Sequence, residues 1–125
     1  MIYVDIDLIF LIISLLFVKH FVADFYLQTN EHVYGKGLYG NSKGIEHSLH
    51  HLIGTFGCLL FFINWEFALV LATVDGVIHY HIDWAKININ KHHNLTPADQ
   101  KFWFWLGVDQ LLHSLTYIWI GWVIF

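Results

Sequence analysis

Residues 67–89 read FALVLATVDGVIHYHIDWAKINI, an apolar stretch that carries one polar stripe. Asp75, His79 and Asp83 recur every four residues and Lys86 follows three residues later, so all four lie along one face of a helix. Ionisable groups inside an apolar helix are costly to bury and by default serve a function. The stretch therefore predicts a helix with an apolar side and a functional polar side.

Three further segments show the same pattern of an apolar helix with a polar stripe. These stripes comprise His20, Asp24 and Gln28; His47 and His51; and Asp109 and His113. Counted from the helix ends that would share one side of a bilayer, the four stripes fall at matching depths of about one to three turns. Stripes at one depth on four helices predict a single shared site inside a bundle.

The composition favours lipid as the solvent of these helices. Of the 125 residues, 57% are hydrophobic and 13% charged, whereas soluble domains contain about 25% charged residues. We predict an all-α fold, an integral membrane antiparallel four-helix bundle, because each segment has roughly the 20 residues needed to cross a bilayer core. It forms one domain, residues 1–125, with helices at about residues 6–28, 44–63, 67–89 and 97–123.

Local signals predict the connections between the helices. Residues 29–43 are polar and glycine-rich, which is typical of a loop. Thr96, Pro97 and Asp99 have the spacing of an N-cap, a first helical residue and a capping-box acid, so Thr96 is predicted to cap the last helix.

The lysines predict the orientation in a membrane. Five lie on the side of the two longer loops, with Lys19 nearest that end of its helix: Lys36, Lys43, Lys86, Lys91 and Lys101. The opposite side carries only acidic charges. The positive-inside rule therefore places both longer loops in the cytoplasm and both termini outside, with a bacterial inner membrane as the expected location.

Imidazoles and carboxylates that converge between facing helices predict a divalent metal site, with zinc preferred and iron or manganese as alternatives. The predicted ligands of one ion are His20, His51, His79 and Asp109. The residues predicted to complete a second ion or the outer shell are Asp24, His47 and Asp83. Asp75 and His113 lie about a turn deeper and are predicted to orient ligands or act as general base.

The remaining polar residues receive smaller predicted roles. Lys86 is expected to pair with Asp83 or Asp24 at the rim of the site, with a substrate phosphate as the alternative. Gln28 and Gln110 are expected to hydrogen-bond to the ligands. The histidines predicted to be solvated in loops are His32, His92 and His93.

The leading hypothesis is a metal-dependent hydrolase whose site opens to the cytoplasmic leaflet and acts on a lipid or lipid-linked substrate. One alternative is a proton or metal-ion transporter or channel, working as a homo-oligomer. Others are a non-catalytic phage or bacterial interaction protein with a structural metal site, haem between two histidines, or a His–Asp network without metal. Membrane lipids are the expected partners. The net charge of −4 and the absence of arginine argue against nucleic acid.

Three motifs carry a resemblance to a known family. HFVADFYLQ (residues 20–28), HYHIDWAK (79–86) and DQLLH (109–113), together with His47 and His51, resemble a domain-of-unknown-function family of small bacterial and phage membrane proteins. The resemblance spans nearly the whole chain and implies an integral membrane helical protein without an assigned reaction. A looser likeness to small inner-membrane metal-dependent hydrolases is an analogy only.

Overall fold

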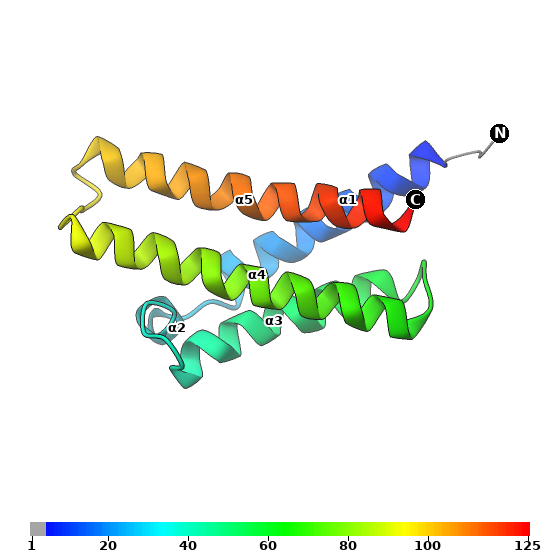
Figure 1. Ribbon diagram of the computed structural model, residues 1–125, viewed down its shortest axis with the longest axis horizontal. Coiled ribbons are helices and arrows are strands. Elements are labelled where there is room, and N and C mark those ends of the chain that lie inside the picture. The colour runs from blue at the N-terminus through cyan, green and yellow to red at the C-terminus, as the bar shows by residue number, and fades with distance from the viewer. Residues whose placement is uncertain (1–4) are drawn as a thin grey trace.

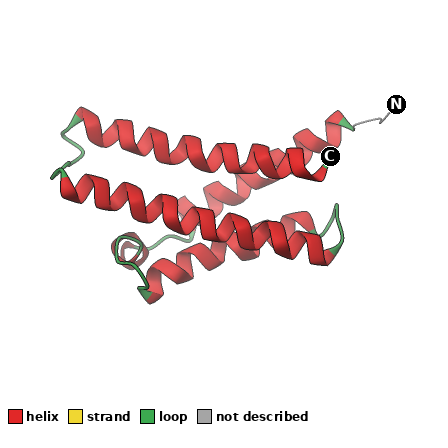
Figure 2. Ribbon diagram, in the orientation of Figure 1, coloured by secondary structure: helices red, strands yellow, loops and turns green. Residues whose placement is uncertain are grey.

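The computed structural model describes residues 5–125, and helix is the only regular secondary structure over this range (Figure 2). The helices are α1 (Ile6–Phe21), continued by a π-helical turn (Val22–Tyr26), α2 (Asn30–Gly35), α3 (Ser42–Leu59), α4 (Trp65–His92) and α5 (Gln100–Ile124). The predicted all-α class is confirmed. Residues 1–4 of the predicted domain lie outside the described residues.

Four long helices pack around one interior (Figure 1). α4 packs along α3 and α5, and α1 crosses the bundle in contact with the same two helices. The start of α1, the C-terminus and the α3–α4 turn lie together at one end, which we call the terminal end. α2 and the α4–α5 connection lie at the opposite end, which we call the loop end.

A fifth helix, α2, occupies part of the stretch that the sequence predicts as a loop. Its first turn is closed by reciprocal hydrogen bonds between Thr29 and His32. The Thr29 backbone N–H donates to His32 Nδ1 at 3.0 Å, and the His32 backbone N–H donates to Thr29 Oγ1 at 3.4 Å. Histidine takes the position that Glu or Gln fills in the usual capping box, so the usual sequence signal is absent.

The sequence predicts that the last helix begins at Pro97, but in the structure it begins at Gln100. The predicted capping residues do interact, because the Thr96 backbone N–H and hydroxyl donate to Asp99 Oδ2 at 2.8 and 3.0 Å. These hydrogen bonds lower the pKa of the Asp99 carboxyl. They close a turn that precedes the helix, and Asp99 itself becomes the N-cap.

Burial is inverted relative to a soluble domain. Among the buried residues of the described chain, fifteen are polar or charged and nine are hydrophobic. Large apolar side chains face outward instead; Phe10, Phe61 and Trp122 are 65%, 84% and 76% exposed. Soluble interiors are mainly apolar, and broad exposed apolar surfaces mark contacts with lipid or with protein.

One segment of the described chain, Ile6–Tyr26, is long and apolar enough to cross a membrane by its length and composition. α3, α4 and α5 contain the polar stripes within their length, which lowers their mean hydropathy. The described chain therefore has one candidate span, and the four that the sequence predicts are not established.

The interior is apolar at the terminal end. Side chains from all four long helices meet there and form what we call the apolar plug: Ile12, Leu16, Leu59, Leu71 and Ile120. The polar stripes meet between this plug and the loop end, so the bundle interior has one apolar half and one polar half.

Candidate metal centre

The fold brings all nine predicted site residues into the interior, where each is at most 8% exposed. His20 lies on α1 and Asp24 on the π-helical turn that follows it. The others come from the three remaining long helices: His47 and His51 from α3, Asp75, His79 and Asp83 from α4, and Asp109 and His113 from α5.

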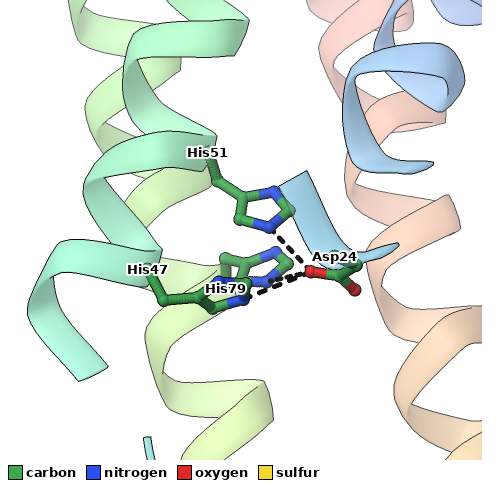
Figure 3. A group of neighbouring side chains, drawn as sticks. All are labelled: Asp24, His47, His51 and His79. Atoms are coloured by element: carbon green, nitrogen blue, oxygen red, sulfur yellow. Dashed lines mark hydrogen bonds and ion pairs between the residues drawn. The ribbon is translucent and has the colours of Figure 1, made fainter. Parts of the chain in front are cut away.

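Asp24 is the point at which two of these helices meet α1 (Figure 3). Its Oδ1 lies 2.8 Å from His51 Nε2, 3.2 Å from His47 Nε2 and 3.6 Å from His79 Nε2. All three imidazoles turn the same ring nitrogen toward one carboxylate oxygen. These four side chains could hold a metal ion.

Asp83 forms a second meeting point beside the first. Its Oδ2 lies 3.3 Å from His47 Nε2 and 3.4 Å from His79 Nε2, so these two imidazoles stand between the carboxylates of Asp24 and Asp83. Its Oδ1 lies 3.3 Å from His113 Nε2. His79, Asp83 and His113 form a second group that could hold an ion, and His79 belongs to both groups.

Several of these distances fit metal coordination better than hydrogen bonding. Tetrahedral zinc ligands at about 2.0–2.1 Å from the ion lie about 3.3 Å from one another, whereas N–H···O hydrogen bonds measure about 2.7–3.2 Å. His47 Nε2 and His79 Nε2 are buried without a hydrogen-bond partner among residues 5–125. Each such atom costs about 1–3 kcal/mol, and a shared cation beside Asp83 would satisfy both.

The predicted ligand set of the first ion is only partly brought together. His51 and His79 are in the first group, but His20 and Asp109 lie outside both groups. His20 Nε2 lies 3.1 Å from Asp24 Oδ2, the carboxylate oxygen that the other imidazoles do not contact, and Asp109 Oδ1 lies 3.6 Å from His113 Nε2. Asp24, predicted for the second ion or outer shell, takes a central place instead.

The π-helical turn accounts for the position of Asp24. In it the Leu27 N–H donates to the Val22 carbonyl, five residues back, at 2.9 Å. Such a turn is wider than an α-helical one and shifts the residues that follow, and it is frequent at functional sites. Counting depth in regular α-turns therefore misplaces Asp24, which lies within the turn.

Asp75, predicted to orient ligands or act as a base, is already paired. Its Oδ2 accepts from Lys19 Nζ at 3.0 Å and from Thr55 Oγ1 at 2.5 Å. Among residues 5–125, the hydrogen bonds of Asp75 link it to the centre through Lys19. His113, the other predicted base, lies in the second ligand group.

Two buried lysines belong to the site, although the sequence pattern indicated only a role in membrane orientation for them. Lys19 is 8% exposed and lies deeper than the imidazoles. Lys36, at the end of α2, is 5% exposed; its Nζ lies 3.1 Å from Asp83 Oδ2 and donates to Gln28 Oε1 at 2.7 Å. Recognising Lys36 would have required predicting α2.

A glycine contact holds Lys36 in this position. A Cβ at Gly44 on α3 would lie 2.9 Å from the Gly35 carbonyl oxygen and 3.0 Å from Lys36 Cα, both backbone atoms that cannot swing aside. Gly44→Ala is therefore expected to displace α2 and to destabilise the protein by about 1–3 kcal/mol in chemical denaturation. Gly57→Ala, where nothing lies within 4 Å, is the control. Equal stability of the two variants would contradict this packing argument.

Two other predicted positions differ. Lys86 does not reach Asp83 or Asp24, and its Nζ lies 3.9 Å from Asp109 Oδ1. His32 is not solvated; it is 3% exposed, and its Nε2 lies 3.3 Å from Glu46 Oε1.

Comparison with known proteins shows a family and no reaction. No curated protein and no solved structure matches the chain. A family model described as a protein of unknown function, DUF3307, matches residues 11–125, a range that contains every residue of the centre. The chain therefore belongs to the DUF3307 family of proteins of unknown function.

Proposed function

We propose that this chain is an integral membrane protein that binds a divalent metal ion, with zinc preferred, and hydrolyses a lipid or lipid-linked substrate. One observation carries the metal site. The buried atoms His47 Nε2 and His79 Nε2 lie 3.3 and 3.4 Å from Asp83 Oδ2, and neither nitrogen has a hydrogen-bond partner within the described chain. Imidazole and carboxylate together suit Zn²⁺, iron and Mn²⁺.

The inverted burial supports a membrane location. The polar stripes face each other inside the bundle, and aromatic and aliphatic side chains cover its outside. This arrangement suits lipid, which solvates the apolar side chains while the bundle interior shields the polar ones. Lys43, Lys91 and Lys101 lie at or near the loop end. By the positive-inside rule this end faces the cytoplasm of a bacterial cell and the terminal end faces outward.

A groove along the seam between α4 and α5 supports a lipid substrate. A cavity of about 280 Å³ in this seam is lined by His81, Lys86 and Asp109 together with apolar side chains. It adjoins an apolar cavity of about 530 Å³ nearer the terminal end, because Ile82 and Leu112 line both. An acyl chain fits the apolar part, and an anionic head group fits the end that carries Lys86.

The arrangement of the chain's own groups suits hydrolysis. A divalent cation at the centre would act as a Lewis acid and lower the pKa of an adjacent water molecule. His113 Nε2 faces the carboxylates of Asp83 and Asp109, so it carries a proton that it is placed to deliver to the leaving group. Asp109 links His113 to Lys86 at the groove, so the groove leads to the second ligand group.

The apolar plug favours this function over transport. A proton or ion path across the bilayer needs polar groups along its whole length. The interior at the terminal end is instead packed with Ile12, Leu16, Leu59, Leu71 and Ile120. The centre is thus a pocket closed at one end.

The metal content of the purified protein tests the proposal. We expect about one to two divalent ions per chain by elemental analysis, and hydrolysis of a fluorogenic phospholipid ester in mixed micelles that stops when a chelator removes the metal. His92→Ala/His93→Ala, which removes two exposed histidines, is the control and should keep the metal. Background metal content in the wild-type protein would refute the metal site, and a metal-loaded protein without esterase or phosphoesterase activity would refute the hydrolase.

A further inference from the structure

Lys19 is the only ammonium group that we find at the inner edge of the centre within residues 5–125, and all its hydrogen bonds are used. An ammonium has three donors and no acceptor. Lys19 Nζ lies 3.0 Å from Asp75 Oδ2, 3.1 Å from Tyr117 Oη and 3.3 Å from His51 Nδ1. Three donors therefore face three acceptors, and each acceptor must present a lone pair.

This contact decides the tautomer of His51. Its Nδ1 accepts from Lys19, so the ring proton is on Nε2. Nε2 lies 2.8 Å from Asp24 Oδ1, which is the length of a good hydrogen bond and shorter than the other two imidazole contacts of that oxygen. His51 is thus a donor to Asp24.

A second branch from Lys19 decides the tautomer of His20. Because Tyr117 Oη accepts from Lys19, its own proton is free to go to His20 Nδ1, 2.8 Å away. The proton of His20 is then on Nε2, which faces Gln110 Oε1 and Asp24 Oδ2, each at 3.1 Å.

Gln110 gives independent evidence for this tautomer. Its side-chain NH₂ donates to Asp109 Oδ2 at 3.0 Å, so its carbonyl oxygen must be the atom that faces His20 Nε2. A carbonyl oxygen only accepts. The nitrogen opposite it therefore carries the proton, as the Tyr117 branch requires.

We propose that Lys19 is a positioning residue that makes His20 and His51 hydrogen-bond donors to Asp24 and excludes both from the metal. This proposal rests on the proposed metal site and refines it. The ion is then held by His47, His79 and the carboxylates of Asp24 and Asp83. These ligands include the two imidazole nitrogens that lack hydrogen-bond partners within the described chain. His20 and His51 instead hold the two oxygens of Asp24, one each, as outer-sphere partners orient a ligand.

The backbone of α3 is shaped for this lysine. A Cβ at Gly54 would lie 2.6 Å from Lys19 Cγ and 2.9 Å from Cδ, in the middle of the lysine stem. Gly54 therefore leaves room for the stem to cross α3 and bring the ammonium to His51. Gly57, one turn further along, has nothing within 4 Å of its Cβ position.

The ligand count around the metal tests the exclusion of His51 and His20. X-ray absorption of the zinc-loaded protein reports the number of coordinated imidazoles. His51→Gln and His20→Gln, which keep an amide donor, should leave this number unchanged, whereas His47→Gln should lower it by one. A loss of one imidazole in His51→Gln or in His20→Gln would overturn the proposal.

The role of Lys19 is tested in the metal-free protein by ¹⁵N NMR of the imidazoles, assigned with the glutamine variants. His20 and His51 should both be protonated at Nε2, and protonation at Nδ1 would overturn the proposal. In Lys19→Met/Asp75→Leu, which removes the buried ion pair as a unit, only Asp24 still favours the Nε2 proton. The fraction of His51 protonated at Nδ1 should therefore rise, and metal should bind about 10–100-fold more weakly. An unchanged tautomer would equally overturn it.

Gly54→Ala provides a variant that keeps every charge. It should shift the tautomer of His51 in the same direction as the double variant, while Gly57→Ala should leave it as in the wild type. Because the NMR measurement needs no metal, it remains decisive if the wild-type protein proves to bind no ion, an outcome that would refute only the proposed function.

Discussion

His79→Ala is expected to reduce bound metal from about one or more ions per chain to background. His79 is the residue shared by both ligand groups, and its Nε2 lies between Asp24 and Asp83 at 3.6 and 3.4 Å. Its removal therefore takes one ligand from each of the two groups. We expect affinity to fall by more than the roughly 10–100-fold that loss of an outer-sphere partner costs, as measured by competition with a chelating dye.

The matched control is His81→Ala, two residues along the same helix. His81 is exposed, and its ring contacts Tyr39 Oη at 3.0 Å and the Val77 carbonyl at 2.7 Å, away from the centre. This variant should bind metal as the wild type does. If both variants lose the metal equally, the loss reflects general unfolding, and if neither does, His79 is not a ligand.

Asp83→Leu is expected to be the most destabilising single substitution of the centre, at about 3–5 kcal/mol. The change leaves the Lys36 ammonium buried beside apolar atoms, since Lys36 Nζ lies 3.1 Å from Asp83 Oδ2 and both side chains are at most 6% exposed. Adding Lys36→Met removes the unpaired charge. The double variant should regain most of the stability in chemical denaturation and still bind no metal.

This pair of variants separates the two roles of Asp83. Lys43→Met is the control, because the ion pairs of Lys43 with Glu46 and Glu31 are exposed and should contribute little. Restored metal binding in the double variant would show that Asp83 is not a ligand. Continued instability in the double variant would show that the Lys36 contact is not what stabilises this region.

The sequence was sufficient to predict the long helices and the residues that face the interior. Asp75, His79 and Asp83 repeat at four-residue spacing on an apolar background, and helical periodicity turns such a pattern into one face. The same rule placed His47 with His51 and Asp109 with His113, and all are buried. Period alone identified these three faces because each of the three stripes lies within a regular helix.

The grouping of those residues could not be predicted in the same way. Asp24 lies in a π-helical turn, and turn counting assumes a constant rise along the helix. Lys36 depends on α2, which is closed by His32 rather than by an acid. Lys19 lies among apolar residues and looks like a charge marking the helix end, yet Gly54 on another helix gives its stem room to turn inward. Each case depends on a contact between distant segments.

The apolar plug has a consequence for the energetics of a cell that contains this protein. Ile12, Leu16, Leu59, Leu71 and Ile120 separate the charged interior from the terminal end. If the bundle spans a bilayer, its histidines and carboxylates exchange protons with one aqueous compartment only. The protein can then be abundant in an energised membrane without dissipating the proton-motive force, and its centre takes on the acidity and metal supply of that compartment alone.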